Sequence, residues 1–162
     1  MAKSFRCSPT PHRRWPPCVP DIDANPIRLR FAGTPRGFEQ AFLQLRGALD
    51  REETKPGVRA RYNIELVFEE IIGNIVRYGA PQGGELRVAV SVEINNDGIA
   101  VTFEDDGIPF NPCSRSDAAN LRTLAEPAEG GFGLKLVHRV ASSMRYERTA
   151  DLNRLVVTLP VL

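Results

Sequence analysis

The sequence has 162 residues, 42% hydrophobic and 25% charged, which is the composition of an ordinary globular domain. Its 21 Lys and Arg balance 20 Asp and Glu, and the formal net charge of +1 excludes a general attraction to nucleic acids or anionic membranes. No apolar run approaches the roughly 20 residues that span a bilayer, and the three cysteines form no Cys-x-x-Cys pair, so a cytoplasmic protein without a disulfide framework is expected.

The first 26 residues are rich in proline and basic side chains and show no apolar periodicity. This composition predicts a disordered tail. It also lacks the apolar core of a secretory signal. The folded domain is therefore expected to span residues 27–162.

Two helices are predicted after a first short strand. Residues 27–31 alternate apolar and basic side chains, which is typical of a strand. Apolar residues recur at helical spacing within residues 35–50 and again within residues 58–78. The second of these helices should end at Gly79.

The second half of the chain predicts two hairpins separated by a long loop and a helix. Residues 85–94 and 99–104 alternate as strands around an Asp-Gly turn. Residues 105–131 are rich in Pro and Gly, and a loop of this length within a compact domain is usually functional, for example as a lid. A helix over residues 133–143 and a closing hairpin over residues 144–159, with its turn at Ala150–Asn153, complete the chain.

This order of elements fits an α+β two-layer sandwich. In this fold class, a mostly antiparallel mixed sheet is covered on one face by helices.

The first chemical motif lies on the second helix. Glu70 and Asn74 are four residues apart and therefore share one helix face. Their oxygens suit Mg²⁺ or a water bound to it, and the carboxylate could serve as a general base. Taken alone, the pair could equally be a solvated helix face.

The second motif, Asp105-Asp106-Gly107, ends a strand. An aspartate there could accept a hydrogen bond from an exocyclic amine such as that of adenine, and Gly107 would allow close backbone approach. An acidic turn that merely closes the strand is the alternative.

The third motif, Gly130-Gly131-Phe132-Gly133, runs directly into a helix start. Free backbone amides at a helix N-terminus bind phosphate. A hinge before the helix is the alternative. The motif is not the dinucleotide-binding fingerprint of the Rossmann fold, because a long loop precedes it instead of a strand.

Together, the order Glu-x-x-x-Asn, Asp-x-Gly, Gly-x-Gly resembles the N, G1 and G2 boxes of the GHKL (Bergerat-fold) ATPase superfamily. Within that superfamily, residues 70–79, 105–112 and 130–137 look similar to the RsbW-type anti-sigma-factor serine kinases of bacterial partner-switching systems. The resemblance covers about residues 27–160.

The resemblance implies a role for each motif in binding Mg-ATP. Asn74 would coordinate the Mg²⁺ that bridges the phosphates of ATP, and Glu70 would be the catalytic base for the acceptor serine hydroxyl. Asp105 would bind the adenine amino group, with Gly107 giving room beside the base. The cofactor-binding stretch at the phosphates would comprise Gly131, Phe132, Gly133 and Leu134.

Two positions depart from the pattern of the family, and one further segment is assigned by it. Pro109 replaces a second glycine of the G1 box and should stiffen that turn. Arg77 stands where histidine is often found; it could approach a phosphate, although a surface role is equally open. Residues 111–130 would form the lid over ATP.

The function implied is that of an ATP-dependent protein-serine kinase acting as an anti-sigma-factor-type regulator. A homodimer would bind a sigma factor or similar regulator and would phosphorylate a small antagonist protein of the STAS type. The alternative is an ATP-binding sequestration module with little or no kinase activity. A DNA-binding domain has no support, because the ordered region contains no basic stripe.

Overall fold

The computed structural model describes residues 26–51, 55–81, 84–113 and 133–160, so the predicted tail lies almost entirely outside the described residues. The elements in chain order are β1 (Ile27–Ala32), α1 (Pro35–Leu49), α2 (Val58–Tyr78), β2 (Arg87–Asn95), β3 (Gly98–Asp105), α4 (Gly133–Val140), β4 (Ser143–Thr149) and β5 (Leu152–Leu159). Among them, no helix is both long and apolar enough to cross a membrane.

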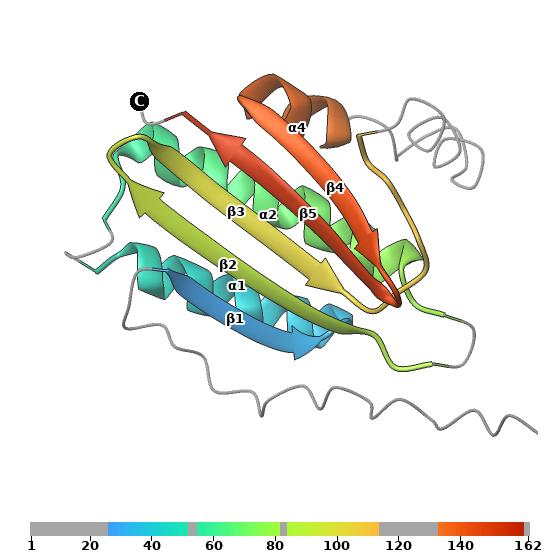
Figure 1. Ribbon diagram of the computed structural model, residues 1–162. Coiled ribbons are helices and arrows are strands. Elements are labelled where there is room, and N and C mark those ends of the chain that lie inside the picture. The colour runs from blue at the N-terminus through green and yellow to red at the C-terminus, as the bar shows by residue number, and fades with distance from the viewer. Residues whose placement is uncertain (1–25, 52–54, 82–83, 114–132, 161–162) are drawn as a thin grey trace, which may run out of the picture.

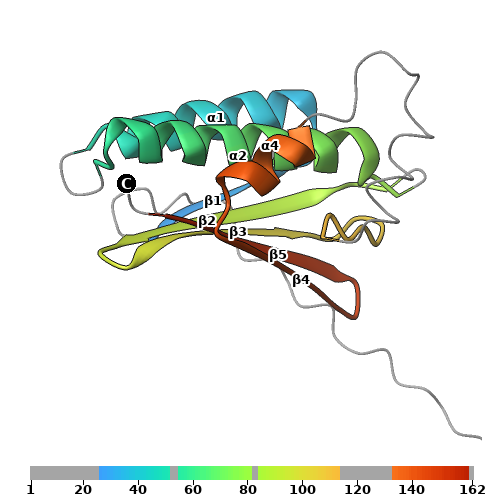
Figure 2. The ribbon, with the colours of Figure 1, turned by 90° about the horizontal axis from the view of Figure 1, so that it is seen from above.

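The strands form one sheet in the order β1-β2-β3-β5-β4. Its four neighbouring pairs are all antiparallel. The helices lie together on one face of this sheet, as the view from above shows (Figures 1 and 2). The predicted two-layer α+β sandwich with a mostly antiparallel sheet is thereby confirmed.

Local signals set the start of α1 and the end of α2 where the sequence predicted them. The side chain of Thr34 caps α1 by accepting a hydrogen bond from Gly37 N at 3.1 Å, and Pro35 occupies the first turn. At the C-terminal end of α2, Gly79 N donates to Ile75 O at 2.7 Å and closes the last turn.

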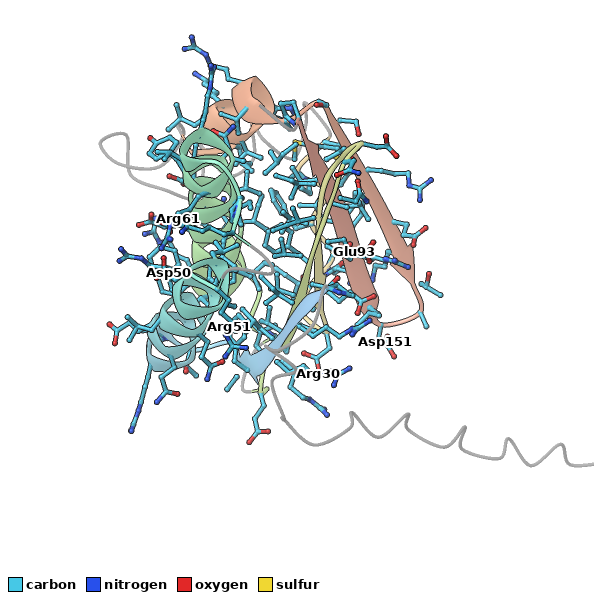
Figure 3. All side chains as sticks on the ribbon, turned by 90° about the vertical axis from the view of Figure 1, so that its left-hand side faces the viewer. Arg30, Asp50, Arg51, Arg61, Glu93 and Asp151 are labelled. Atoms are coloured by element: carbon cyan, nitrogen blue, oxygen red, sulfur yellow. The ribbon has the colours of Figure 1, made fainter. Side chains whose placement is uncertain are left out.

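The core lies between α2 and the inner face of the sheet. Phe68 of α2 packs against Phe31, Phe38 and Phe42, with ring centroids 5.7–6.3 Å apart. On the outer side of the helices, Arg61 pairs with Asp50 and joins α2 to the end of α1 (Figure 3). The packed aromatic rings stabilise this layer far more than the exposed ion pair, whose attraction is weakened by solvent.

The last helix and the last hairpin differ in their bounds from the prediction. The helix ends at Val140 instead of residue 143, because Ser142 N donates to Thr158 O at 2.8 Å and the chain joins the sheet. The final turn is also tighter than predicted. Ala150 adopts a left-handed conformation, with φ of 52°, and β5 begins at Leu152. Asn153 therefore lies within a strand and not in the turn.

Candidate functional site

A cavity of about 290 Å³ opens between the C-terminal half of α2, the ends of β3 and β5, and the first turn of α4. Its size is near the lower end of small-molecule sites, about 300–1,000 Å³. Most of its wall is apolar, which suits a flat ring. The lining residues are Ile71, Asn74, Ile75, Tyr78, Gly79, Phe103, Asp105, Ile108, Pro109, Phe110, Pro112, Leu134, Tyr146, Asn153 and Leu155.

Asp105 supplies a buried carboxylate to this cavity. It is the last residue of β3 and is only 6% exposed. Its Oδ1 accepts hydrogen bonds from Gly107 N at 3.0 Å and from Asn153 Nδ2 at 2.8 Å. All hydrogen bonds that this carboxylate receives from the described residues reach Oδ1. The second oxygen, Oδ2, is therefore the one available to a ligand.

Burial is the largest influence on the protonation of Asp105. Burial raises the pKa of this carboxyl above its ordinary 3.8, and the hydrogen bonds from Asn153 and Gly107 partly oppose that rise. The neighbouring carboxylate of Asp106 also raises the pKa, whereas the guanidinium of Arg148 lowers it. A carboxyl with a raised pKa in a cavity is typical of a functional group.

Gly107 fixes the turn that follows Asp105. A Cβ atom at this position would lie 2.3 Å from Gly79 O, a backbone atom that cannot move aside cheaply. The next residue, Ile108, donates its N–H to the same Gly79 oxygen at 3.0 Å. The turn after β3 is thus tied to the end of α2, and only glycine fits there.

Asn74 and Glu70 project from α2 on the side of α4. Asn74 lines the cavity and is half-buried. Glu70, one turn earlier, lies against Gly133, whose added Cβ would be 1.8 Å from Glu70 Oε2. Burial raises the pKa of the Glu70 carboxyl; the charge of Glu69 adds to the rise, and that of Arg77 opposes it.

The remaining predicted residues separate into three groups. Leu134 lines the cavity together with Asn74, and Gly133 is the first residue of α4. Arg77 is exposed and does not line the cavity; its guanidinium carbon lies 5.8 Å from the centre of the Tyr78 ring. Gly131, Phe132 and most of the predicted lid lie outside the described residues.

The sequence reading missed three polar residues of the last hairpin: Tyr146, Arg148 and Asn153. The Asn153 amide donates to Asp105, and its oxygen accepts hydrogen bonds from Tyr146 Oη at 2.7 Å and Arg148 Nη1 at 2.6 Å. A signal was present, because Asn153 is the first member of the alternation that continues through Leu155 to the buried face of β5. Its assignment to the turn concealed that signal.

The donor set suits a Mg²⁺ ion held chiefly by phosphate. Within the four described ranges, no three His, Cys, Asp or Glu side chains gather as a metal site. Mg²⁺ commonly takes only one or two protein oxygens and completes its shell with water and substrate phosphates. The side-chain oxygen of Asn74 at the cavity wall fits that arrangement.

Comparison with known proteins gives three findings. The family model described as "Histidine kinase-like ATPase domain" matches residues 26–159. The serine/threonine-protein kinase BtrW of Bordetella bronchiseptica is 23% identical over 100 residues, which are 62% of this chain and 70% of that protein. The structure of Acinetobacter baumannii histidine kinase AdeS covers 86% of this chain and 72% of its own at 16% identity, a loose similarity with a TM-score of 0.43.

Proposed function

This chain belongs to the histidine kinase-like ATPase domain family, and we propose that it binds Mg-ATP in the cavity beside Asp105 and phosphorylates a serine of a partner protein. An ATPase domain implies ATP binding. The observation that best supports the site is that Asn74 and Asp105, far apart in the sequence, line the same apolar cavity. From Ile71 to Gly79, α2 extends about 12 Å along this cavity, at about 1.5 Å per residue, and so can serve both ends of one nucleotide.

Adenine would lie at the Asp105 end. Its exocyclic amine would donate to Asp105 Oδ2, and its ring would pack between apolar side chains of α2 and β5, such as Ile75 and Leu155. Gly107 permits the close approach of the turn to the Gly79 carbonyl at this end of the cavity. These contacts combine one directional hydrogen bond with apolar burial, as small-molecule sites generally do.

The phosphates would lie between Asn74 and the start of α4. Backbone N–H groups at a helix N-terminus attract phosphate, and Gly133 brings the backbone of α4 against the Glu70 carboxylate. When bound, Mg²⁺ would neutralise charge on the phosphates, with Asn74 as its protein ligand.

Glu70 would act as the general base. It would take the proton of the acceptor serine hydroxyl as that oxygen bonds to the γ-phosphorus, while the bond from the γ-phosphorus to the β,γ-bridging oxygen breaks and ADP leaves. Burial raises the pKa of this half-buried carboxyl, which makes its ionised form a stronger base. The similar protein BtrW is named a serine/threonine-protein kinase, which supports serine as the acceptor.

The partner would be a small STAS-type antagonist that competes with a sigma factor or similar regulator, and the kinase would work as a homodimer in the cytoplasm. Phosphorylation of the antagonist would end the competition and leave the regulator bound.

Titration calorimetry with ADP and ATP, with and without Mg²⁺, tests the nucleotide site. Magnesium-dependent ATP binding that Asp105→Asn abolishes is expected, and a folded protein that binds neither nucleotide would contradict the proposal. Incubation with a STAS-type antagonist and γ-labelled ATP then tests the transfer. Label on an antagonist serine is expected; ATP binding without label on any serine would favour the sequestration module.

A further inference from the structure

The side-chain amide of Asn153 is buried, and its NH₂ group contacts acceptors while its oxygen contacts donors. It is 5% exposed and pairs with Asp105 across the β3–β5 ladder. Its Nδ2 donates to Asp105 Oδ1 at 2.8 Å and to Ile108 O at 2.9 Å. The amide therefore joins the carboxylate to the backbone turn that follows it.

Arg148 and Tyr146 fix the orientation of that amide. Arg148 Nη1 is 2.6 Å from Asn153 Oδ1, and a guanidinium can only donate. If the amide were flipped, its NH₂ group would face the guanidinium, and its oxygen would face the Asp105 carboxylate and the Ile108 carbonyl. Arg148 also donates to Gly107 O at 3.1 Å, so the same guanidinium holds the turn and the amide.

This orientation determines which oxygen of Asp105 meets a ligand and in which form. Oδ1 already receives two N–H donors, from Gly107 and Asn153. Any proton on the carboxyl must then sit on Oδ2. An ionised Oδ2 accepts a hydrogen bond, as an amine requires, whereas a protonated Oδ2 would donate and would match a carbonyl oxygen instead.

We propose that Asn153, held by Arg148 and Tyr146, is a positioning residue that keeps Asp105 a hydrogen-bond acceptor and so selects a 6-amino purine over a 6-oxo purine. The inference rests on the proposed nucleotide site and adds a determinant of its base specificity. Tyr146 acts on the base through Asn153, and Arg148 acts through Asn153, the turn and its charge near Asp105.

The groups facing Asp105 indicate a pH-dependent selectivity. Burial and Asp106 favour the protonated carboxyl, while Asn153, Gly107 and Arg148 favour the ionised one. Removing Asn153 should therefore raise the pKa of Asp105 further. The ratio of the affinities for ADP and IDP isolates this effect, because both ligands carry the same titrating phosphates.

The test measures that ratio by titration calorimetry between about pH 8 and pH 5 for the wild type, Asn153→Ala and Arg148→Met. Arg154→Met is the matched control, since Arg154 is an exposed arginine on β5 that pairs only loosely, at 3.7 Å, with Glu104 and Glu147. We expect the wild type to prefer ADP and the preference to fall by about tenfold in Asn153→Ala. The pH at which the remaining preference is half lost should rise, and Arg154→Met should change neither quantity.

Arg148→Met gives the answer if Asn153→Ala does not fold, because it leaves the buried amide in place and removes the guanidinium that holds both the amide and the turn. A third variant tests the orientation itself. In Asp105→Asn, the two donors at Oδ1 should hold the new amide oxygen and direct its NH₂ into the cavity, which shifts the preference toward IDP.

Folded variants that keep both the ADP to IDP ratio and the pH midpoint of the wild type would overturn the inference while leaving the nucleotide site intact. A folded wild type that binds neither ADP nor IDP would overturn the site and the inference together.

Discussion

Gly133, the first residue of α4, lies directly against the carboxylate of Glu70 on α2. A Cβ atom built on Gly133 would be 1.8 Å from Glu70 Oε2, and the obstructing atom belongs to the flexible end of a side chain. A larger residue at position 133 should therefore displace the carboxylate without breaking the fold. Gly133 thus connects the start of α4 to the position of the proposed base.

Replacing this glycine should separate stability from catalysis. In Gly133→Ala, we expect the melting temperature to change little, while phosphoryl transfer to the antagonist falls because Glu70 is pushed from its position. The matched control is Gly47→Ala in α1, where nothing lies within 4 Å of the new methyl group. That control should gain roughly 0.5–1 kcal/mol of stability and keep full activity. Undiminished transfer by Gly133→Ala would show that the contact has no catalytic importance.

The charge of Glu70 itself can be removed with little change of shape. Glu70→Gln should retain its affinity for ADP within about twofold and lose about 100-fold or more in transfer rate, the usual contribution of a general base. Single-turnover transfer from γ-labelled ATP measures the step. Glu69→Gln, which changes the adjacent exposed glutamate, should transfer at close to the wild-type rate. Equal rates for the two variants would remove Glu70 from the base role.

The sequence predicted most of the fold because its patterns are local. The apolar spacing within α2 and the alternation within β2 and β3 reflect one buried face in each element. The caps at Thr34 and Gly79 are also local signals. The order of the motifs predicted one site for Asn74 and Asp105, and both residues line the same cavity, although nothing in the sequence alone measures the distance between them.

The polar network beneath the cavity could not be predicted from local patterns. Asn153 meets Asp105 only because β5 pairs with β3, across a separation of 48 residues. β5 begins directly after the tight β4–β5 turn, in which Ala150 takes a left-handed conformation that alanine seldom adopts. Neither glycine nor asparagine marks position 150 as the turn, so the sequence predicts a later start for β5 and places Asn153 in the turn.

Asn74 should govern the magnesium dependence of binding. We expect wild-type protein to bind ATP more tightly with Mg²⁺ than with a chelator, and this ratio to fall toward one in Asn74→Ala. ADP binding through the Asp105 end of the cavity should persist more strongly than ATP binding. Asn96→Ala, in the exposed turn between β2 and β3, controls for the general loss of an asparagine side chain. An unchanged magnesium ratio in Asn74→Ala would exclude Asn74 as the metal ligand.

The ionised carboxylate of Asp105 should destabilise the ligand-free protein at neutral pH. The pKa of this buried carboxyl is raised in the folded state. Its favourable contribution to the free energy of unfolding is therefore fully present below the ordinary pKa of 3.8, and it is lost as the pH rises through the pKa of the folded state. In Asp105→Asn, the amide oxygen can keep both hydrogen bonds from Gly107 and Asn153 without a buried charge. The variant should therefore melt above the wild type at pH 7, by a margin that shrinks as the pH falls toward 4, while it loses affinity for ADP. Thermal unfolding across this pH range measures the margin. A variant that is less stable than the wild type at pH 7 would mean that Asp105 is retained for folding, whereas the expected gain identifies it as a residue kept for binding at the expense of stability.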